Sequence, residues 1–250
     1  MSRAGNLLIQ LRGSLVIAWI NGWLAMTRMP IWLISSLTAP ASIALMIIFF
    51  GGYRYLGIGL IGGISMLIGV NGVGLVGDGA FYRLELKFQN MLIATPLTPV
   101  SYTLGLALSS LLYSMPGIAV MAGILAYRGI IMPWSAAPIT ASLFAEWLST
   151  SMLGFTISTY LRDTRYAWAI GNILGFTLGT LFPVFYPATI LPIPYIAIVS
   201  PVSAASIVIQ YVSGVTRYNA SLPLAAAASL AAQAAIFTLL AMYKSRWRSN

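Results

Sequence analysis

Glu146 is the residue of this chain whose type and position most suggest chemistry, because it is the one acid in the middle of a long apolar run. If that run crosses a membrane, a charge there costs roughly 2.5 to 3.5 kcal/mol on insertion scales. The carboxyl group then contacts a substrate or carries a proton inside a helix bundle. Alternatively it is protonated or hydrogen-bonded and fixes helix packing near Trp147, Ser149 or Ser151. Both interpretations stay open.

Other chemistry is limited by the residues that the chain lacks. It contains no histidine and no cysteine, which removes the commonest general base and thiolate chemistry. Residues 72–77 match the dinucleotide pattern G-x-G-x-x-G, but that fingerprint follows a strand, and here it ends an apolar segment. No phosphate-binding G-x-x-x-x-G-K-[ST] loop occurs in the sequence. We therefore expect no enzyme activity, no catalytic or metal site and no cofactor in this chain.

Three further polar residues lie in or beside apolar runs. Asn71 and Asn172 are candidates for a substrate pathway, although interhelical hydrogen bonds explain both more simply. Asp78 is expected to pair with Arg83. Glycines spaced by four residues, Gly59 with Gly63 and the series 171, 175 and 179, predict close helix packing, either inside one subunit or across a dimer.

The composition places the chain in a membrane. Hydrophobic residues make up 59% and charged residues 7% of the 250 residues, and the mean hydropathy is +0.90. A soluble domain carries about 25% charged residues. The apolar runs lack the alternation of barrel strands, so the fold class is an all-α membrane protein. The net charge of +9 is spread over nearly every loop, which argues against a nucleic-acid partner.

The apolar runs predict six transmembrane helices in a single domain, residues 1–250. The spans are expected at 31–50, 56 to about 77, about 101–127, about 133–160, from 166 onward, and about 222–243. Five prolines crowd the region between the last two, so we interpret residues 185–213 as a re-entrant segment. The uncharged run 13–27 is shorter than a span and has apolar residues at helical spacing. Residues 1–29 are therefore expected to form an amphipathic interfacial helix, with a signal peptide as the less favoured alternative.

This topology gathers the basic residues on one side of the membrane. Three of them, Arg54, Arg128 and Arg217, fall on the opposite side. The remaining ten are Arg3, Arg12, Arg28, Arg83, Lys87, Arg162, Arg165, Lys244, Arg246 and Arg248. The positive-inside rule then predicts a multi-pass protein of the cell membrane with both termini in the cytoplasm.

The stretch 84–99, LELKFQNMLIATPLTP, lies between the second and third predicted spans. Apolar residues recur at three- and four-residue intervals, and Thr95-Pro96 ends the pattern, which predicts an amphipathic helix over 84–95. A helix of this kind at the cytoplasmic face is suited to docking another protein. The residues expected to make these contacts are Leu84, Glu85, Lys87, Phe88, Met91 and Leu92.

Taken together, the chain resembles the permease subunit of the type-2 ABC transporter family of drug, polysaccharide and lipid exporters. The resemblance rests on 84–99 with its Ala-Thr-Pro turn, on the proline-rich run 182–192 with Val199-Ser200-Pro201, and on the N-terminal helix. Lys87-Phe88-Gln89 departs from the family's usual acidic, glycine-containing run. The resemblance implies six spans per subunit and a pathway between two subunits, as a homodimer or heterodimer in membrane lipid. It also implies a separate ATPase subunit, which binds ATP and Mg and docks on 84–95 and on the N-terminal helix.

The expected function is thus a transmembrane permease subunit of an ATP-driven exporter. The alternative is a stand-alone secondary transporter or substrate-binding membrane subunit, in which Glu146 would carry protons. The apolar stripe at the cytoplasmic face favours the first interpretation, because a secondary transporter has no need of it.

Overall fold

The structure is a computed structural model that describes residues 3–88 and 95–243, and the regular elements in these ranges are all helical. Within them, five helical stretches are long and apolar enough to cross a membrane. They are Leu7–Arg28, Leu33–Gly51, Tyr53–Leu84, Pro99–Tyr127 and Ser221–Tyr243. The chain is therefore an all-α, multi-pass membrane protein.

The bundle follows an N-terminal helical stretch made of α1 (Arg3–Ala18), a π-helical turn (Trp19–Leu24) and α2 (Ala25–Arg28). Its long helices are α3 (Pro30–Gly51), α4 (Leu56–Leu84), α6 (Pro99–Tyr127), α7 (Ala136–Ser158), α8 (Thr164–Phe176), α9 (Pro201–Val212) and α10 (Ser221–Tyr243). A π-helical turn, Thr177–Leu181, extends α8. Short 3-10 turns occupy Tyr53–Tyr55, Pro133–Ser135, Ala188–Ile190 and Pro194–Val199.

Helix α4 is the centre of the bundle, because most of its length is buried beneath α3, α6, α7, α8 and α9. An oxygen-bearing cap defines where three of its neighbours begin, and α6 and α9 also have proline at the first turn. Thr98 caps α6, Asp163 caps α8 and Ser200 caps α9, each accepting a backbone N–H. Gly129 after α6 has a φ of +67°, a conformation that a side chain disfavours, and it ends that helix.

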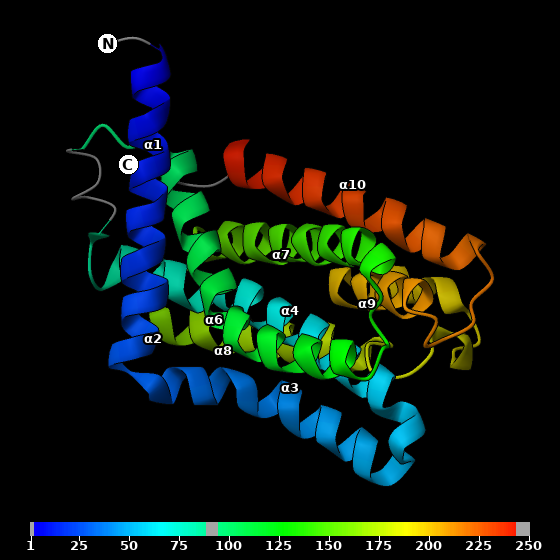
Figure 1. Cartoon of the computed structure of the whole chain (residues 1–250). Coiled ribbons are helices and arrows are strands. Elements are labelled where there is room, and N and C mark those ends of the chain that lie inside the picture. Colours follow the sequence, from blue (N-terminus) through cyan, green and yellow to red (C-terminus); the bar gives the residue numbers. More distant parts are fainter. Residues whose placement is uncertain (1–2, 89–94, 244–250) are drawn as a thin grey trace.

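The N-terminal stretch has nearly the bounds expected for the 1–29 helix. Helix runs from Arg3 to Arg28, and its part Leu7–Arg28 is long and apolar enough to cross a membrane, although its uncharged run 13–27 alone is not. In Figure 1, however, α1 stands upright across one end of the bundle, whereas α3, α7 and α10 run away from it. Ile17 and Ala18 pack on the bundle, while Leu11 and Leu15 of the predicted apolar stripe are exposed. These two apolar residues thus face away from the protein, whereas Met26, at the end of the same pattern, is buried.

The boundary between the second span and the predicted 84–95 helix also needs correction. Helix α4 continues past residue 77 and ends at Leu84, so Leu84 is the last residue of α4 and does not open a new helix. The chain turns at Glu85 and Leu86, and Lys87 has a left-handed φ of 49°. The extension is explained by Arg83 and Glu85, which are hydrogen-bonded to the turn between α7 and α8.

The predicted re-entrant region consists of two parts. Residues 182–199 form bends and 3-10 turns, and α9 follows as a regular helix. At 1.5 Å per residue, a 12-residue helix is about 18 Å long, well short of the roughly 30 Å hydrocarbon core. Helix α9 is too short to cross a bilayer by itself. Its length is compatible with the re-entrant segment expected for this region.

The glycine series pack inside the subunit. A Cβ at position 171 or 175 of α8, or at 179 in its π-helical extension, would meet Val76, Val70 or Met66 of α4, respectively. Gly59 and Gly63 of α4 likewise face Ala44 of α3. Internal packing, the simpler of the two interpretations, is confirmed for both series, so neither is available at a dimer interface.

Two of the six predicted spans are not among the five apolar stretches of the described ranges. Helix α7 has 23 residues and is long enough, but Glu146 and its many serines and threonines lower its hydropathy. Helix α8 with its π-helical extension is short. The coarse prediction of a helical membrane bundle is confirmed, and the count of six spans stays a prediction.

Candidate functional site

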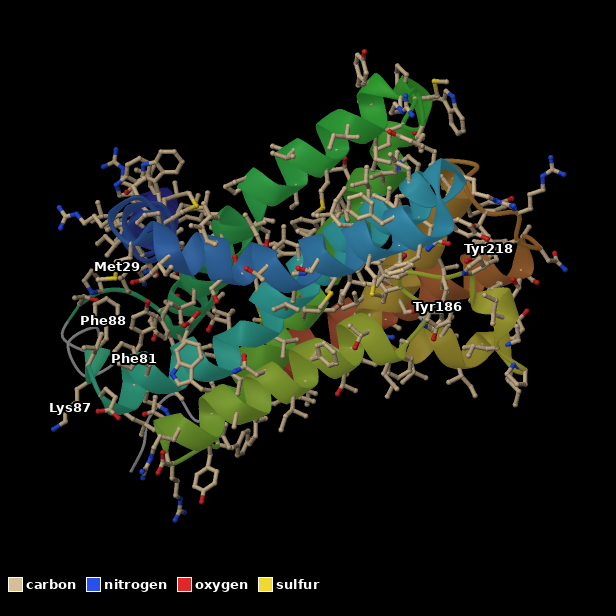
Figure 2. All side chains as sticks on the ribbon, turned by 90° about the horizontal axis from the view of Figure 1, so that it is seen from below. Met29, Phe81, Lys87, Phe88, Tyr186 and Tyr218 are labelled. Carbon is tan, nitrogen blue, oxygen red and sulfur yellow. The ribbon has the colours of Figure 1, made fainter. Side chains whose placement is uncertain are left out.

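One end of the bundle collects most of the described basic side chains. Helices α4, α7 and α10 end there, α3, α6 and α8 begin there, and α1 crosses it (Figure 1). We call it the basic end; its described cations are Arg12, Arg28, Arg83, Lys87, Arg162 and Arg165. Figure 2 shows Met29, Lys87 and Phe88 at this end and Tyr186 and Tyr218 at the other.

Arg83 fastens the end of α4 to the end of α7. Its guanidinium donates to the carbonyl oxygens of Ser158 (2.8 Å) and Thr159 (3.0 Å), and also to that of Leu161. A cation is favoured at the C-terminus of a helix, where backbone carbonyls lack partners. The expected local pair between Asp78 and Arg83 is therefore wrong, since the guanidinium is engaged by α7.

The turn between α7 and α8 carries two further bonds. The Thr164 hydroxyl donates to the Glu85 carboxylate over 2.9 Å, which ties the residue after α4 to the start of α8. Arg165 and Asp163 form a salt bridge of 3.0 Å, the one ion pair found among the described residues. Hydrogen bonds from the Arg165 side chain hold the pKa of Asp163 below its ordinary value.

Phe88 points into the bundle. Its ring lies 6.3 Å from that of Tyr82 on α4 and 6.2 Å from that of Tyr102 on α6, and Tyr102 in turn contacts Phe155 of α7. Leu84 is likewise half-buried against the cluster around Ala80. Of the apolar contacts predicted for this helix, Leu84 and Phe88 thus face inward.

The residues between Leu84 and Phe88, at the start of the connection from α4 to α6, face outward. Glu85, Leu86 and Lys87 are exposed, with Leu86 at 50%. Sequence reasoning placed Leu86 off the contact set, because it assumed that the apolar stripe faced outward. Met91 and Leu92, also predicted contacts, lie outside the described residues.

Gln10 of α1 fastens the other end of the connection. Its amide donates to the Pro96 carbonyl (2.7 Å), and its oxygen accepts from the Thr98 backbone N–H (2.9 Å) and from the Ser101 hydroxyl (2.6 Å). Ser14 adds a bond to the Ser101 carbonyl. Helix α1 and the start of α6 are therefore joined as one unit, a contact that the sequence analysis missed.

The three pathway candidates lie in different surroundings. Asn71 donates to the Ser114 hydroxyl of α6 over 2.9 Å, which confirms the simpler interpretation of an interhelical bond. Glu146 is fully buried on α7, and neither of its oxygens has a well-formed hydrogen bond to a described residue, although the Ser65 hydroxyl of α4 lies toward it. Asn172 is exposed on the outer side of α8. The structure does not bring the three together.

At the opposite end, Gln210 of α9 organises the irregular residues 182–199. It is fully buried; its amide donates to the Val184 carbonyl (3.2 Å), and its oxygen accepts from the hydroxyls of Thr216 (3.0 Å) and Tyr218 (2.9 Å). Ser206, one turn earlier, donates to the same Val184 carbonyl. Burial raises the pKa of Tyr218. Backbone without helix partners is tolerated at membrane depth only when protein groups satisfy it.

The same arrangement recurs on α10. Ser229 and Gln233 both donate to the Ile198 carbonyl, over 2.9 and 2.8 Å, and the Gln233 amide also donates to Ser229. Each pair has the spacing Ser-x-x-x-Gln, one helical turn. That repeated spacing was the sequence signal available for both pairs, which we call the Ser-Gln clamps.

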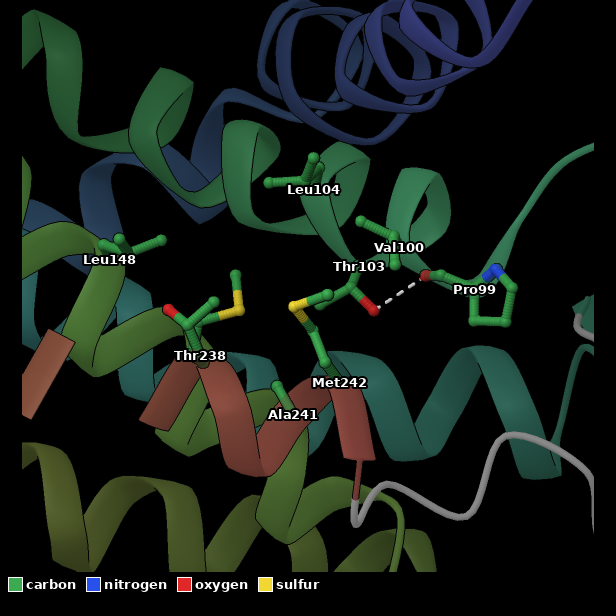
Figure 3. A pocket seen from close by; sticks show the side chains of 9 residues that line it. Pro99, Val100, Thr103, Leu104, Leu148, Thr238, Ala241 and Met242 are labelled. Atoms are coloured by element: carbon green, nitrogen blue, oxygen red, sulfur yellow. Dashed lines mark hydrogen bonds between the residues drawn. The ribbon is translucent and has the colours of Figure 1, made fainter. Parts of the chain in front are cut away.

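A small apolar cavity of about 60 Å³ opens between α6, α7 and α10 near the basic end (Figure 3). Leu104, Leu148 and Met242 line it, and the Thr103 hydroxyl turns away to bond the Pro99 carbonyl. None of the predicted pathway residues line this cavity. Its size is that of a packing gap between helices and not that of a transport substrate.

The G-x-G-x-x-G pattern at residues 72–77 does not lie in a loop after a strand. Residues 72–77 lie within the continuous helix α4, where Gly72 meets Thr150 of α7 and Gly77 meets Trp168 of α8. The G-x-G-x-x-G pattern is therefore a helix-packing feature.

Comparison with protein-family models, with curated proteins and with solved structures finds no match to this chain.

Proposed function

We propose that the chain is the transmembrane permease subunit of an ATP-driven exporter. It would form the substrate pathway with a second permease subunit and couple to a separate ATPase subunit that holds ATP and Mg. The observation that carries this proposal is that the connection between α4 and α6 is anchored at both of its ends while Glu85, Leu86 and Lys87 stay exposed.

The anchors define where a movement of this connection would be felt. Arg83 and Glu85 link its start to α7 and α8, and Gln10 links its end to α1. Phe88 between them contacts α4 and α6 through aromatic rings. A partner that displaces the exposed residues would therefore act on five helices together, which is the task of a coupling element. Phe88 would transmit the movement and would not itself contact the partner.

The distribution of charge supports the proposed topology. The described basic side chains at the basic end outnumber those of the opposite end, Arg54, Arg128 and Arg217. By the positive-inside rule the basic end would be cytoplasmic, together with both termini. Residues 182–199 and α9, held by the Ser-Gln clamps, would then form the re-entrant segment on the outer side.

The proposal is tested by purifying the protein from its native membrane in mild detergent and measuring ATP hydrolysis in the isolated complex. We compare wild type with Leu86→Asp and Lys87→Glu, which change exposed residues, and with Arg217→Glu as the matched control at the opposite end. The proposal expects a co-purifying ATPase that both test variants lose by about tenfold or more and the control keeps, the size of loss typical of a charge placed in an interface. Wild-type protein that emerges without ATPase contradicts it.

A second candidate function is a stand-alone, proton-driven transporter, favoured by one observation. The Glu146 carboxyl is buried without a well-formed hydrogen bond, and an intramembrane acid of this kind is a candidate proton carrier. Purified protein in vesicles under a pH gradient would then take up protons, and Glu146→Gln would abolish the uptake while Ser65→Ala would retain it. Proton flux that is equal in wild type and Glu146→Gln contradicts this second function.

A further inference from the structure

Helix α4 is buried along most of its length except at one polar strip. Within residues 57–80, the residues that are not buried are Val70, Asn71, Gly74 and Asp78. Asn71, Gly74 and Asp78 follow one another at spacings of three and four residues, so they lie on one face of the helix. A Cβ added at Gly74 would meet no atom of the described residues within 4 Å. This face of α4 therefore borders an open space, which we call the Asp78 opening.

The Asp78 carboxylate is an acid without a partner in the described part of the chain. It makes no hydrogen bond there, and the one salt bridge in these ranges joins Asp163 to Arg165. Arg83, the cation that follows it on α4, is bonded to carbonyl oxygens of α7 instead. Asp78 lies six residues before the end of α4, about 9 Å at 1.5 Å per residue. The unpaired charge is therefore inside the bundle but close to its basic end.

The cost of this charge favours a cationic ligand. An ionised acid inside a membrane costs roughly 2.5 to 3.5 kcal/mol on insertion scales. Glu146 on α7 is completely enclosed by protein, whereas Asp78 is partly exposed at the opening. A ligand of positive charge can therefore reach Asp78 and offset that cost, and an anion is repelled.

Two tyrosines lie close enough to Asp78 for its charge to act on their hydroxyl groups. One is Tyr82, a turn later on α4, and the other is Tyr113 on α6. Both side chains are half-buried, and neither hydroxyl has a hydrogen-bond partner among the described residues. Asn71 ties α6 to α4 here through its bond to Ser114. Aromatic faces attract ammonium groups and similar organic cations, and the attraction grows when water is excluded.

A hard metal ion fits this arrangement less well. Mg²⁺ and Ca²⁺ take six or more oxygen ligands, and the carboxylate with two hydroxyls offers fewer. No group of three or more acidic side chains that could hold a metal ion occurs among the described residues. The rings of Tyr82 and Tyr113 instead suit a cation that carries apolar groups.

We propose that the Asp78 opening binds a monovalent organic cation with apolar substituents. Asp78 is its counter-ion, and the rings of Tyr82 and Tyr113 contact its apolar groups. The inference rests on the proposed function in one respect, since it assigns cationic amphiphiles as the substrate class of the exporter.

The site is tested by measuring the binding of radiolabelled tetraphenylphosphonium to the purified full chain in detergent, by equilibrium dialysis. Tetraphenylborate, an anion of the same shape, is the matched probe of opposite charge. We expect saturable binding of the cation and none of the anion. Asp78→Asn should weaken cation binding at least tenfold, the size of loss that follows removal of one partner of an enclosed charge pair. Asp78→Glu should keep most of the affinity.

Glu85→Gln is the matched control variant, because it removes one negative charge at the exposed end of the same helix. It should change the affinity less than about twofold, since exposed charges contribute little. The aromatic contact is tested by Tyr113→Leu, expected to weaken binding about fivefold, against Tyr113→Phe, which keeps the ring and should keep the affinity. Asp78→Asn removes an unpaired charge, so its thermal unfolding midpoint should equal or exceed that of wild type. If it unfolds, the Tyr113 variants decide the matter.

Three outcomes overturn the inference. They are the absence of saturable binding to wild type, equal affinities of wild type and Asp78→Asn, and displacement of the probe by sodium or potassium ions at constant ionic strength, which would assign the opening to an inorganic cation. The assay needs no ATPase. Specific binding without a co-purifying ATPase therefore contradicts the exporter and leaves the cation site standing, and a co-purifying ATPase without binding contradicts the site alone.

Discussion

The two ends of the bundle solve one structural problem with different chemistry. Both must satisfy carbonyl groups that lie outside regular helix hydrogen bonding. At the basic end, the half-buried Arg83 guanidinium donates to three carbonyls at the end of α7. At the opposite end, the neutral amides of Gln210 and Gln233 donate to single carbonyls of the segment 182–199.

The difference follows from the cost of burial. A guanidinium stays charged and must keep some contact with water, whereas a carboxamide can be enclosed completely once each of its groups is bonded. Gln210 is fully buried, and Arg83 is not. Side chains at the basic end therefore keep some contact with water and can be reached by a partner. The amide of Gln210 at the clamped end is enclosed by protein.

The largest effect on stability is expected at the end held by the Ser-Gln clamps. Gln210→Leu removes bonds to Val184, Thr216 and Tyr218 and leaves buried hydroxyls to find new partners. We expect a loss of about 4 kcal/mol in the free energy of unfolding, since each unsatisfied buried group costs about 1 to 3 kcal/mol. In a chain of this size that lowers the thermal unfolding midpoint in detergent by about 10 °C.

Thr216→Val serves as the control for that variant. It removes one hydroxyl bond to the Gln210 oxygen and keeps the bonds of Gln210 to Tyr218 and Val184. Its midpoint should lie between those of wild type and Gln210→Leu. A Gln210→Leu protein as stable as wild type would show that the clamp is not needed to hold segment 182–199.

The next largest effect on stability is expected at the basic end. Arg83→Ala removes a charged donor from the end of α7 and should lower the free energy of unfolding by about 2 kcal/mol, the range for hydrogen bonds from charged groups. Arg165→Ala is the control, because its side chain is 91% exposed and such pairs contribute little. Equal midpoints for the two variants would contradict the contrast between them.

Sequence reasoning reached the elements that depend on length and composition. The apolar runs predicted the helical membrane bundle, the prolines predicted a segment over 185–213 that does not span as one helix, and glycine spacing predicted close packing. These features follow from the solvent, because a bilayer forces the backbone into helices or protein-covered turns. Little tertiary information is needed for that step.

The contacts between residues that are distant in the sequence could not be predicted in the same way. Gln10 and Pro96 are 86 residues apart, and Gln210 collects partners from two loops whose course depends on the whole fold. Phe88 was assigned outward because an apolar stripe has two possible sides to face, and only the neighbouring Tyr82 and Tyr102 decide between them. Pattern identifies a face of a helix, and packing decides what that face meets.

The second clamp should respond less than the first. Gln233 is half-buried, and Ser229 continues to donate to the Ile198 carbonyl when the glutamine is removed. We therefore expect Gln233→Leu to cost about 1 kcal/mol, the value of a typical single hydrogen bond. The double variant Ser229→Ala with Gln233→Leu leaves that carbonyl without either donor and should cost more than the sum of the two single changes. Simple additivity would contradict a shared role.

The smallest effect is expected at the exposed turn before α8, and it depends on pH. Because the pKa of Asp163 is lowered in the folded protein by Arg165, its stabilising contribution is present above the ordinary value of 3.8 and is lost as the pH falls through the lower folded value. Acidification below about pH 4 should thus loosen the first turn of α8, where Asp163 caps the helix. Hydrogen exchange of the amides at Arg165 and Tyr166 measures this opening. Asp163→Asn keeps a capping oxygen without a titrating group, so its protection relative to intrinsic exchange should not change over the same pH range; identical pH dependence in both proteins would assign the loosening to another group.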